Sequence, residues 1–184
     1  MTSEKTRKRN SCICGIIGML ALILLDQWTK LLAVRHLKEA SHPLIDGVFS
    51  LQYLENRGAA FGMMQGRQWL FAIMAVIIVA VFGYAYYRLP YERKFRILRI
   101  VLCFLLAGAL GNLIDRLTRN FVVDFFYFEL INFPIFNVAD CYVTLSAVML
   151  IILYLFYYKD GDFENLIPKK YRSQKESKTD NDQI

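Results

Sequence analysis

The sequence predicts an all-α membrane protein with four transmembrane helices, cytoplasmic N- and C-termini, a small extracytoplasmic β-like segment and an interfacial segment. Its 184 residues are 56% hydrophobic and 21% charged, against about 45–50% and about 25% in typical soluble domains. The apolar residues form four long stretches separated by short charged segments. This grouping is typical of a polytopic membrane protein, so the net charge of +6 is poor support for nucleic-acid binding.

Each apolar stretch reaches the length of about 20 residues that a bilayer core requires. The first follows a basic leader, but no small-residue cleavage site follows it, so we expect a retained helix rather than a cleaved signal peptide. We expect one integral-membrane domain over residues 1–168 and a disordered polar tail over residues 169–184. The expected spans are residues 11–34, 68–87, 97–117 and 136–158.

Basic residues in the flanking segments set the expected orientation. The leader carries four Lys and Arg, the segment between spans two and three carries five, and the tail carries six, together 15 of the 22 in the chain. All three segments fall on one side of a four-span protein. By the positive-inside rule that side is the cytoplasm.

The two segments expected outside the membrane are longer than turns. Residues 35–67 contain VFSLQYLE, whose imperfect alternation of side chains predicts a short strand or two. Residues 118–135 are apolar and aromatic but include an Asp and a Glu, so we expect this segment to lie at the outer membrane interface.

Polar residues inside or beside the spans are the strongest functional signal. With the expected topology, all of them fall in the outer half of the bilayer or just above it. Charges in hydrocarbon are costly and normally face a bundle interior or a wet cavity. The sequence therefore predicts one polar site at the outer leaflet, formed by Asp26, Lys30, Asn56, Asn112, Asp115, Arg116, Asp124, Asn137, Asp140 and Thr144.

Several of these residues have a structural explanation. Asp26 and Lys30, spaced i and i+4, can form an ion pair that serves only stability. Asp115 fits a supporting role near a helix end, and the two amides Asn112 and Asn137 can be interhelical hydrogen-bonding groups.

Asp140 is harder to explain structurally, because it lies about one turn inside span four with no adjacent cation. Together with Asp124 it forms a candidate carboxylate pair. Two carboxyl groups in one space cannot both ionise easily, so one becomes a general acid and the other a general base. Such a pair can activate a water against an amide carbonyl.

Other catalytic systems fit less well. The chain has two His, His36 and His42, and no metal-binding motif, so no metal and no cofactor are expected. A Ser-His-Asp triad is disfavoured because both His lie in the first outer segment without a matching Ser elbow. A Cys141 nucleophile is disfavoured because no His is positioned to activate it.

Five segments resemble the signature blocks of the bacterial lipoprotein signal peptidase family, also called signal peptidase II. They are DQWTK (26–30), NRGAAFG (56–62), GALGNLIDRL (108–117), VVDFF (122–126) and FNVADCYV (136–143), in the order typical of the family. The resemblance implies an intramembrane aspartic endopeptidase of the bacterial cytoplasmic membrane. It would cleave signal peptides from prolipoproteins just before a Cys that already carries a diacylglyceryl group.

The resemblance also assigns roles to residues. Asp124 and Asp140 match the catalytic dyad, and Asp26, Lys30 and Asp115 match supporting positions. It implies binding of the cyclic peptide globomycin, and we expect a monomer that contacts membrane lipid. The positions that match the substrate and inhibitor pocket are Asn56, Asn112, Arg116 and Asn137.

Two further hypotheses remain. A small transporter or channel could move protons or ions through Asp124, Asp140 and Lys30, but these groups cluster on one side and form no path across the bilayer. A non-catalytic scaffold would leave the buried Asp140 unexplained. Gly58 and Gly62 could be hinges of an outer lid, or could only permit a tight turn.

Overall fold

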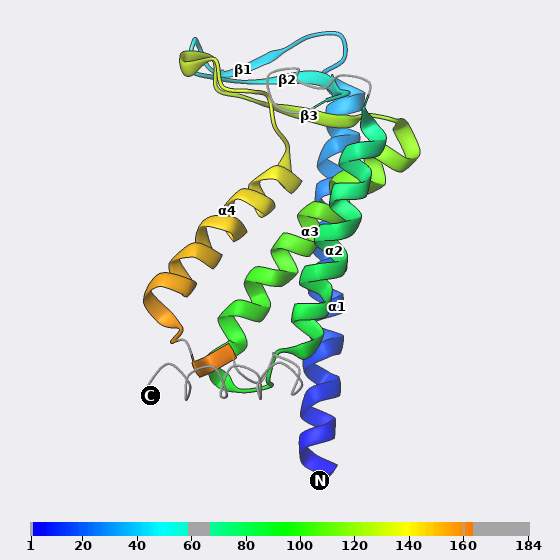
Figure 1. The fold of residues 1–184 in the computed structure, drawn as a ribbon. Coiled ribbons are helices and arrows are strands. Elements are labelled where there is room, and N and C mark those ends of the chain that lie inside the picture. The colour runs from blue at the N-terminus through cyan, green and yellow to red at the C-terminus, as the bar shows by residue number, and fades with distance from the viewer. Residues whose placement is uncertain (1, 59–66, 160, 164–184) are drawn as a thin grey trace, which may run out of the picture.

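The computed structural model describes residues 2–58, 67–159 and 161–163, with a small sheet at one end of a bundle of long helices (Figure 1). Four of its helical segments are long and apolar enough to cross a membrane, which confirms the predicted number of spans. The expected tail at 169–184 and Gly62 lie outside the described residues. The helices are α1 (Thr2–His36), α2 (Gln68–Arg88), α3 (Arg96–Arg119) and α4 (Val138–Ile152), the last continued by a π-helical turn over Leu153–Tyr157.

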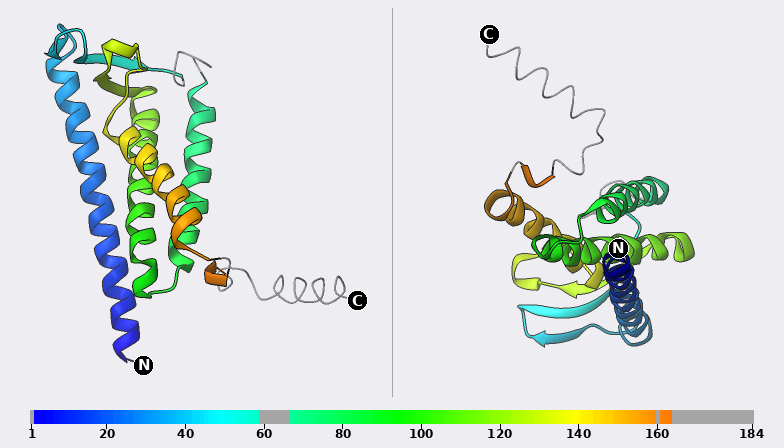
Figure 2. Two further views of the ribbon diagram at one scale, coloured as in Figure 1. Left: turned by 90° about the vertical axis from the view of Figure 1, so that its left-hand side faces the viewer. Right: turned by 90° about the horizontal axis from the view of Figure 1, so that it is seen from below.

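Helix α3 is the centre of the bundle and packs against the other three spans (Figure 2). Within its apolar stretch 72% of the residues are buried, compared with 6% in α1 and in α2. The outer helices turn large apolar side chains away from the protein, such as Leu24 at 69% exposed. Exposed apolar surface of this extent suits contact with lipid rather than water.

Glycines permit close contact where α3 meets its neighbours. A Cβ at Gly108 would lie 2.5 Å from the carbonyl oxygen of Ala139 on α4. A Cβ at Gly111 would lie 2.5 Å from the Oδ2 atom of Asp26 on α1. Both distances are too short for a residue with a Cβ unless the backbone of α4, in the first case, or the carboxylate of Asp26, in the second, shifts.

The sheet is antiparallel, in the order β1 (His42–Ile45), β2 (Phe49–Asn56) and β3 (Val122–Tyr127). Gly47, with a φ of 68°, forms the turn between β1 and β2. Strand β2 covers most of the segment predicted to be extended. Strand β3 was not predicted, because VVDFFY lacks alternation: its first four residues are all buried.

Two Asn residues mark the connections that lead into and out of this region. Asn120 ends α3 in the left-handed conformation, with a φ of 61°, which Asn tolerates better than most residues. Asn137 caps α4 by accepting a hydrogen bond from the backbone N–H of Asp140. The start of α1, the α2–α3 connection and the end of α4 all lie at the end of the bundle opposite the sheet (Figure 1).

Candidate active site

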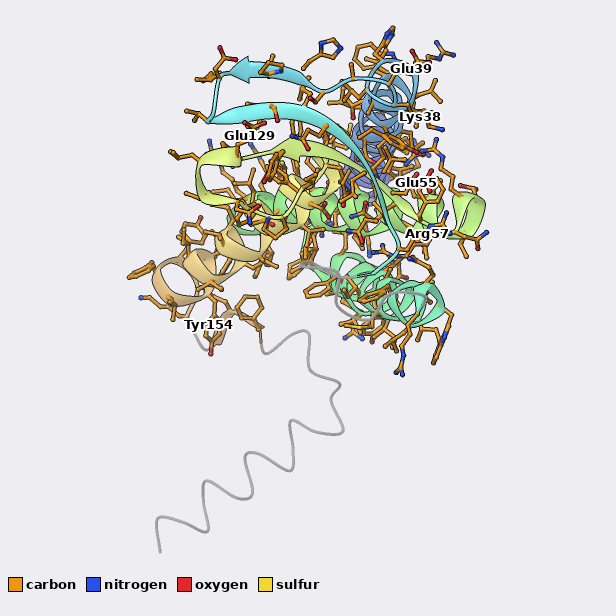
Figure 3. All side chains as sticks on the ribbon, turned by 90° about the horizontal axis from the view of Figure 1, so that it is seen from above. Lys38, Glu39, Glu55, Arg57, Glu129 and Tyr154 are labelled. Atoms are coloured by element: carbon orange, nitrogen blue, oxygen red, sulfur yellow. The ribbon has the colours of Figure 1, made fainter. Side chains whose placement is uncertain are left out.

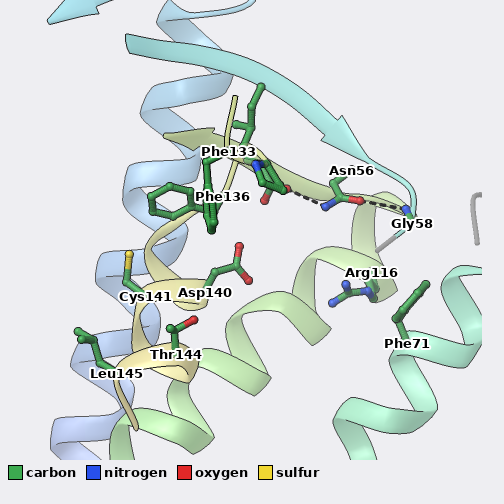
Figure 4. A pocket seen from close by; sticks show the side chains of 13 residues that line it. Asn56, Gly58, Phe71, Arg116, Phe133, Phe136, Asp140, Cys141, Thr144 and Leu145 are labelled. Atoms are coloured by element: carbon green, nitrogen blue, oxygen red, sulfur yellow. Dashed lines mark hydrogen bonds between the residues drawn. The ribbon is translucent and has the colours of Figure 1, made fainter. Parts of the chain in front are cut away.

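A cavity of about 680 Å³ lies between the sheet and the adjoining ends of the helices (Figure 4). Asp124 comes from β3 and Asp140 from the first turn of α4, and both line it. The other polar side chains on its wall are Asn56, Arg116, Cys141 and Thr144. The chain therefore brings two acids that are distant in sequence to one cavity.

Asp124 is buried and accepts two hydrogen bonds from amides. Its side chain is only 1% exposed. Oδ2 accepts from Nδ2 of Asn56 at 2.8 Å, and Oδ1 accepts from Nδ2 of Asn137 at 2.6 Å. Burial raises the pKa of Asp124 to about 7 and the Asp140 carboxylate adds to the increase, while the two amide hydrogen bonds oppose it. At neutral pH a large fraction of Asp124 is thus protonated.

Asp140 forms a reciprocal capping box with Asn137 at the start of α4. Its Oδ2 atom accepts from the backbone N–H of Asn137 at 3.1 Å, and its backbone N–H donates to Oδ1 of Asn137 at 3.0 Å. Its Oδ1 atom accepts from Nδ2 of Asn112 at 2.8 Å. These contacts fix the carboxyl group while leaving it at the cavity wall, where it faces the same space as Arg116 (Figure 4).

Asn137 connects the two acids. It is fully buried, and its Nδ2 atom donates to Asp124 and, at 3.2 Å, to Oδ1 of Asn112. The same side chain caps Asp140. Asn112 and Asn137 therefore lie behind the acids and hold them, whereas Asn56 and Arg116 line the cavity itself.

A buried ionic cluster lies behind Asn112. The Nζ atom of Lys30 lies 2.9 Å from Oδ2 of Asp26, 3.0 Å from Oδ2 of Asp115 and 2.9 Å from Oδ1 of Asn112. The three charged side chains are 0% exposed. Lys30 has three N–H groups and meets three acceptors, so its donors are all used.

The same cluster ties several elements together. Asp26 accepts from the backbone N–H of Ala139 at 2.9 Å, and Asp115 accepts from that of Val123 at 3.2 Å. It thus joins α1, α3, β3 and α4 directly beneath the acids. Asp115 lies inside this cluster rather than at an exposed helix end.

Neither Gln27 nor the aromatic residues of the cavity wall were predicted from the sequence. Nε2 of Gln27 lies within hydrogen-bonding distance of Asp26, Asp115 and the carbonyl oxygen of Gly111. Its only signal in the sequence was its position next to Asp26. The cavity wall also includes Phe71, Phe133 and Phe136, and the centre of the Phe71 ring lies 5.5 Å from the guanidinium carbon of Arg116.

The surface of the sheet end differs from the walls of the bundle. Viewed from that end, charged side chains lie along the sheet and its connections (Figure 3). Lys38 lies 5.3 Å from the centre of the Tyr53 ring, and Glu55 pairs with Arg57 at 2.9 Å. The sheet end therefore carries charged side chains beside exposed apolar ones such as Leu130, whereas the outer helices expose mainly apolar side chains along the bundle.

Comparison with known proteins identifies the family. A model described as signal peptidase (SPase) II matches residues 18–156. The chain belongs to the signal peptidase II family. It is 44% identical over 143 residues to the lipoprotein signal peptidase of Clostridioides difficile, a match that covers 77% of this chain and 95% of that one.

Other members of the signal peptidase II family match over similar lengths. The lipoprotein signal peptidase of Latilactobacillus sakei is 45% identical, over 76% of this chain and 91% of that one. A solved structure described as a bacterial membrane enzyme superposes with a TM-score of 0.70 at 30% identity, covering 80% of this chain and 92% of that one. The chain is therefore a multi-pass membrane protein of a peptidase family.

Proposed function

We propose that this protein removes signal peptides from diacylglyceryl-modified prolipoproteins, cutting just before the lipidated Cys, and that Asp124 and Asp140 activate the attacking water. One observation carries the proposal: two carboxyl groups from β3 and α4 line one cavity and are connected by a single buried amide, Asn137. The name lipoprotein signal peptidase of the relatives supports the substrate class.

The different burial of the two acids suggests different roles. Asp124, with its pKa near 7, starts as the protonated general acid. Asp140 is only partly buried at the cavity wall and starts as the general base. Asp140 takes a proton from the water, and the water oxygen attacks the scissile carbonyl carbon. At the same time Asp124 protonates the carbonyl oxygen.

Breakdown of the resulting gem-diol completes the reaction. The C–N bond breaks, the leaving amine takes the proton held by Asp140, and one hydroxyl of the diol returns a proton to Asp124. The products are the new carboxyl end of the signal peptide and an amino-terminal lipidated Cys, and the carboxyl proton passes to the released amine. The dyad returns to its starting protonation state, so no cofactor enters the proton balance.

Residues on the cavity wall have proposed substrate roles. Arg116 lines both the main cavity and a groove of about 530 Å³ between α2 and α3, so it can donate to substrate backbone carbonyls at their junction. Nδ2 of Asn56 donates a hydrogen bond to Oδ2 of Asp124 and so helps to position this acid. In this scheme Asn112, Asn137, Asp26, Lys30 and Asp115 position the acids without touching substrate.

The membrane placement follows from the substrate. A diacylglyceryl-Cys would hold the scissile bond at headgroup depth, so the proposal requires the cavity to lie at that depth. We place the cavity at the outer leaflet of the bacterial cytoplasmic membrane, with both termini in the cytoplasm, as the basic segments indicate. Globomycin binding and a monomeric enzyme are parts of the same proposal.

A transporter fits the geometry less well. The acids, Arg116 and the Lys30 cluster all gather near the sheet, and α2 carries no charged residue between Gln68 and Arg88. Helix α2 therefore provides no series of polar groups along which ions could move toward the opposite end of the bundle. A polar site at one end of the bundle favours a hydrolase over a transporter.

A gel-shift assay with a lipid-modified prolipoprotein and purified enzyme in detergent tests the proposal. We expect Asp124→Asn and Asp140→Asn each to lower turnover by about 10²–10⁴-fold or more, because an amide cannot transfer the required protons. Asp46→Asn, at an exposed acid in the β1–β2 turn, is the matched control and should be fully active. Full activity in either dyad variant would remove that residue from catalysis.

A further inference from the structure

We propose that the end of the bundle opposite the sheet binds one anionic phospholipid, with its phosphodiester among Arg93, Arg96 and Arg99 and an acyl chain in the groove between α1 and α3. This site is separate from the peptidase cavity and goes beyond the proposed reaction. With the proposed topology the lipid belongs to the inner leaflet.

The headgroup pocket is polar and rich in arginine. It has a volume of about 440 Å³ and is lined by Ser11, Tyr91, Glu92 and the three arginines. Three guanidinium groups face one carboxylate there, so the pocket is cationic. Guanidinium groups bind phosphate oxygens through paired, charge-assisted hydrogen bonds.

The three arginines lack acidic partners in the part of the chain that the structure describes. Among the described residues, Lys94 and Asp162 form an ion pair at this end, at 2.5 Å, and no ion pair involves Arg93, Arg96 or Arg99. Glu92 forms no ion pair with them although it lines the same pocket. The pocket is therefore complementary to an anion from outside these residues.

Arg99 is held rigidly at the inner wall of the pocket. Arg99 is only 6% exposed. It donates to the carbonyl oxygen of Tyr86, near the end of α2, and to those of Leu89 and Pro90, which follow that helix. Its guanidinium carbon lies 3.8 Å from the centre of the Tyr91 ring. These contacts stabilise the end of α2 but leave the charge without a carboxylate, and its Nε atom has no hydrogen-bond partner among the described residues.

An apolar groove begins where the cationic pocket ends. The groove, of about 270 Å³, shares Ser11, Arg96 and Arg99 with the headgroup pocket. It continues along Gly15, Gly18 and Leu22 of α1, against α3. A Cβ added at Gly18 would meet no atom within 4 Å, so the groove is open there.

This combination fits a phospholipid better than a free anion. A phosphate ion would use the arginines but not the apolar groove, and a neutral lipid would use the groove but not the arginines. A zwitterionic headgroup brings its own cation into a pocket that already holds three. An anionic phospholipid such as phosphatidylglycerol satisfies both parts.

Photolabelling tests the site. The full-length enzyme in neutral detergent would be mixed with phosphatidylglycerol that carries a diazirine in one acyl chain, then irradiated and mapped by peptide mass spectrometry. We expect labelling within residues 11–22 and 96–104. Unlabelled phosphatidylglycerol should compete, while phosphatidylcholine and glycerol 3-phosphate should not.

Three variants separate this site from general attraction to a basic surface. Arg96→Gln should lower labelling about tenfold, and Gly18→Leu should lower it as strongly by filling the groove. Arg88→Gln is the matched control, because Arg88 lies at the same end but outside both cavities, and its labelling should be unchanged. Each variant must unfold at the wild-type temperature without added lipid, which shows that the fold is intact.

Several results would overturn the proposal. Equal labelling by a phosphatidylcholine probe would mean that charge does not select the lipid. Competition by glycerol 3-phosphate would indicate a free-phosphate site. Unchanged labelling in Arg96→Gln and Gly18→Leu, or an equal loss in Arg88→Gln, would mean that the lipid does not use this pocket and groove.

Discussion

Asn56→Ala should move the alkaline limb of the pH–activity profile. The Nδ2 atom of Asn56 donates to Asp124 at 2.8 Å, and this hydrogen bond lowers the pKa of Asp124 by stabilising its ionised form. A hydrogen bond to a charged group contributes about 1.5–3 kcal/mol, and one pKa unit corresponds to about 1.4 kcal/mol. Loss of the bond should therefore raise the pKa of Asp124 from about 7 by about one to two units.

The sign follows from the role of Asp124 as the acid. Activity requires its protonated form, so kcat declines as the pH rises through its pKa. With Asn56→Ala this decline should occur about one to two pH units higher than in the wild type. Because Asn56 also lines the cavity, the variant is expected to change KM and the height of the profile, and the position of the limb is the informative quantity.

The assay measures kcat between about pH 5 and pH 10 on a lipid-modified peptide with a fluorophore and a quencher on either side of the scissile bond. Gln52→Ala is the control, because Gln52 lies on the same strand but contacts Ser50 and Glu129 rather than Asp124. Its alkaline limb should coincide with that of the wild type. An unmoved or acid-shifted limb in Asn56→Ala would refute the assignment of Asp124 as the acid.

Three further predictions concern stability, measured by thermal unfolding in detergent. Lys30→Met removes the cation that buried Asp26 and Asp115 share, leaving Asp115 with Arg119 at 3.5 Å, and should cost about 3–5 kcal/mol; an unchanged unfolding temperature would contradict the cluster. Gly111→Ala should cost about 1–3 kcal/mol by overpacking, whereas its control Gly83→Ala, with open space around it, should be neutral or stabilising. Asp124 has a folded-state pKa near 7, above its ordinary 3.8, so its contribution to stability is present below about pH 4 and lost as the pH rises to about 7. The stability of Asp124→Asn relative to the wild type should thus be higher at pH 8 than at pH 4 by about 4 kcal/mol, and an equal effect at both would refute the raised pKa.

Helical spans were predictable because each depends on a property of consecutive residues. An apolar stretch of sufficient length identifies α2 whatever it packs against, and its observed bounds differ from the expected ones by one residue. Strand β3 had no such signal. Its residues Val122, Val123, Asp124 and Phe125 are buried together because the sheet lies between charged connections and the bundle, which is a property of the tertiary structure.

The candidate acids were recognisable for a similar reason, and their partners were not. Asp140 was recognisable because an unpaired acid inside a membrane span is costly in free energy. The sequence alone shows where such an acid lies. That Asn137 hydrogen bonds to Asp124 while capping Asp140 depends on the path of β3, which the sequence did not predict. The division between residues that line the cavity and residues that lie behind it depends on the same path.

The buried Lys30 cluster fixes the orientation of one amide, the side chain of Asn112. Asn112 can place either its oxygen or its nitrogen toward Asp140, and only the nitrogen can donate to that carboxylate. Lys30 is a pure donor, so its contact with Oδ1 of Asn112 fixes the oxygen on its own side and directs Nδ2 to Asp140. A fully buried cation normally requires anions, and Asp26 and Asp115 supply them. Stability of the bundle and placement of the proposed base therefore depend on the same three N–H groups.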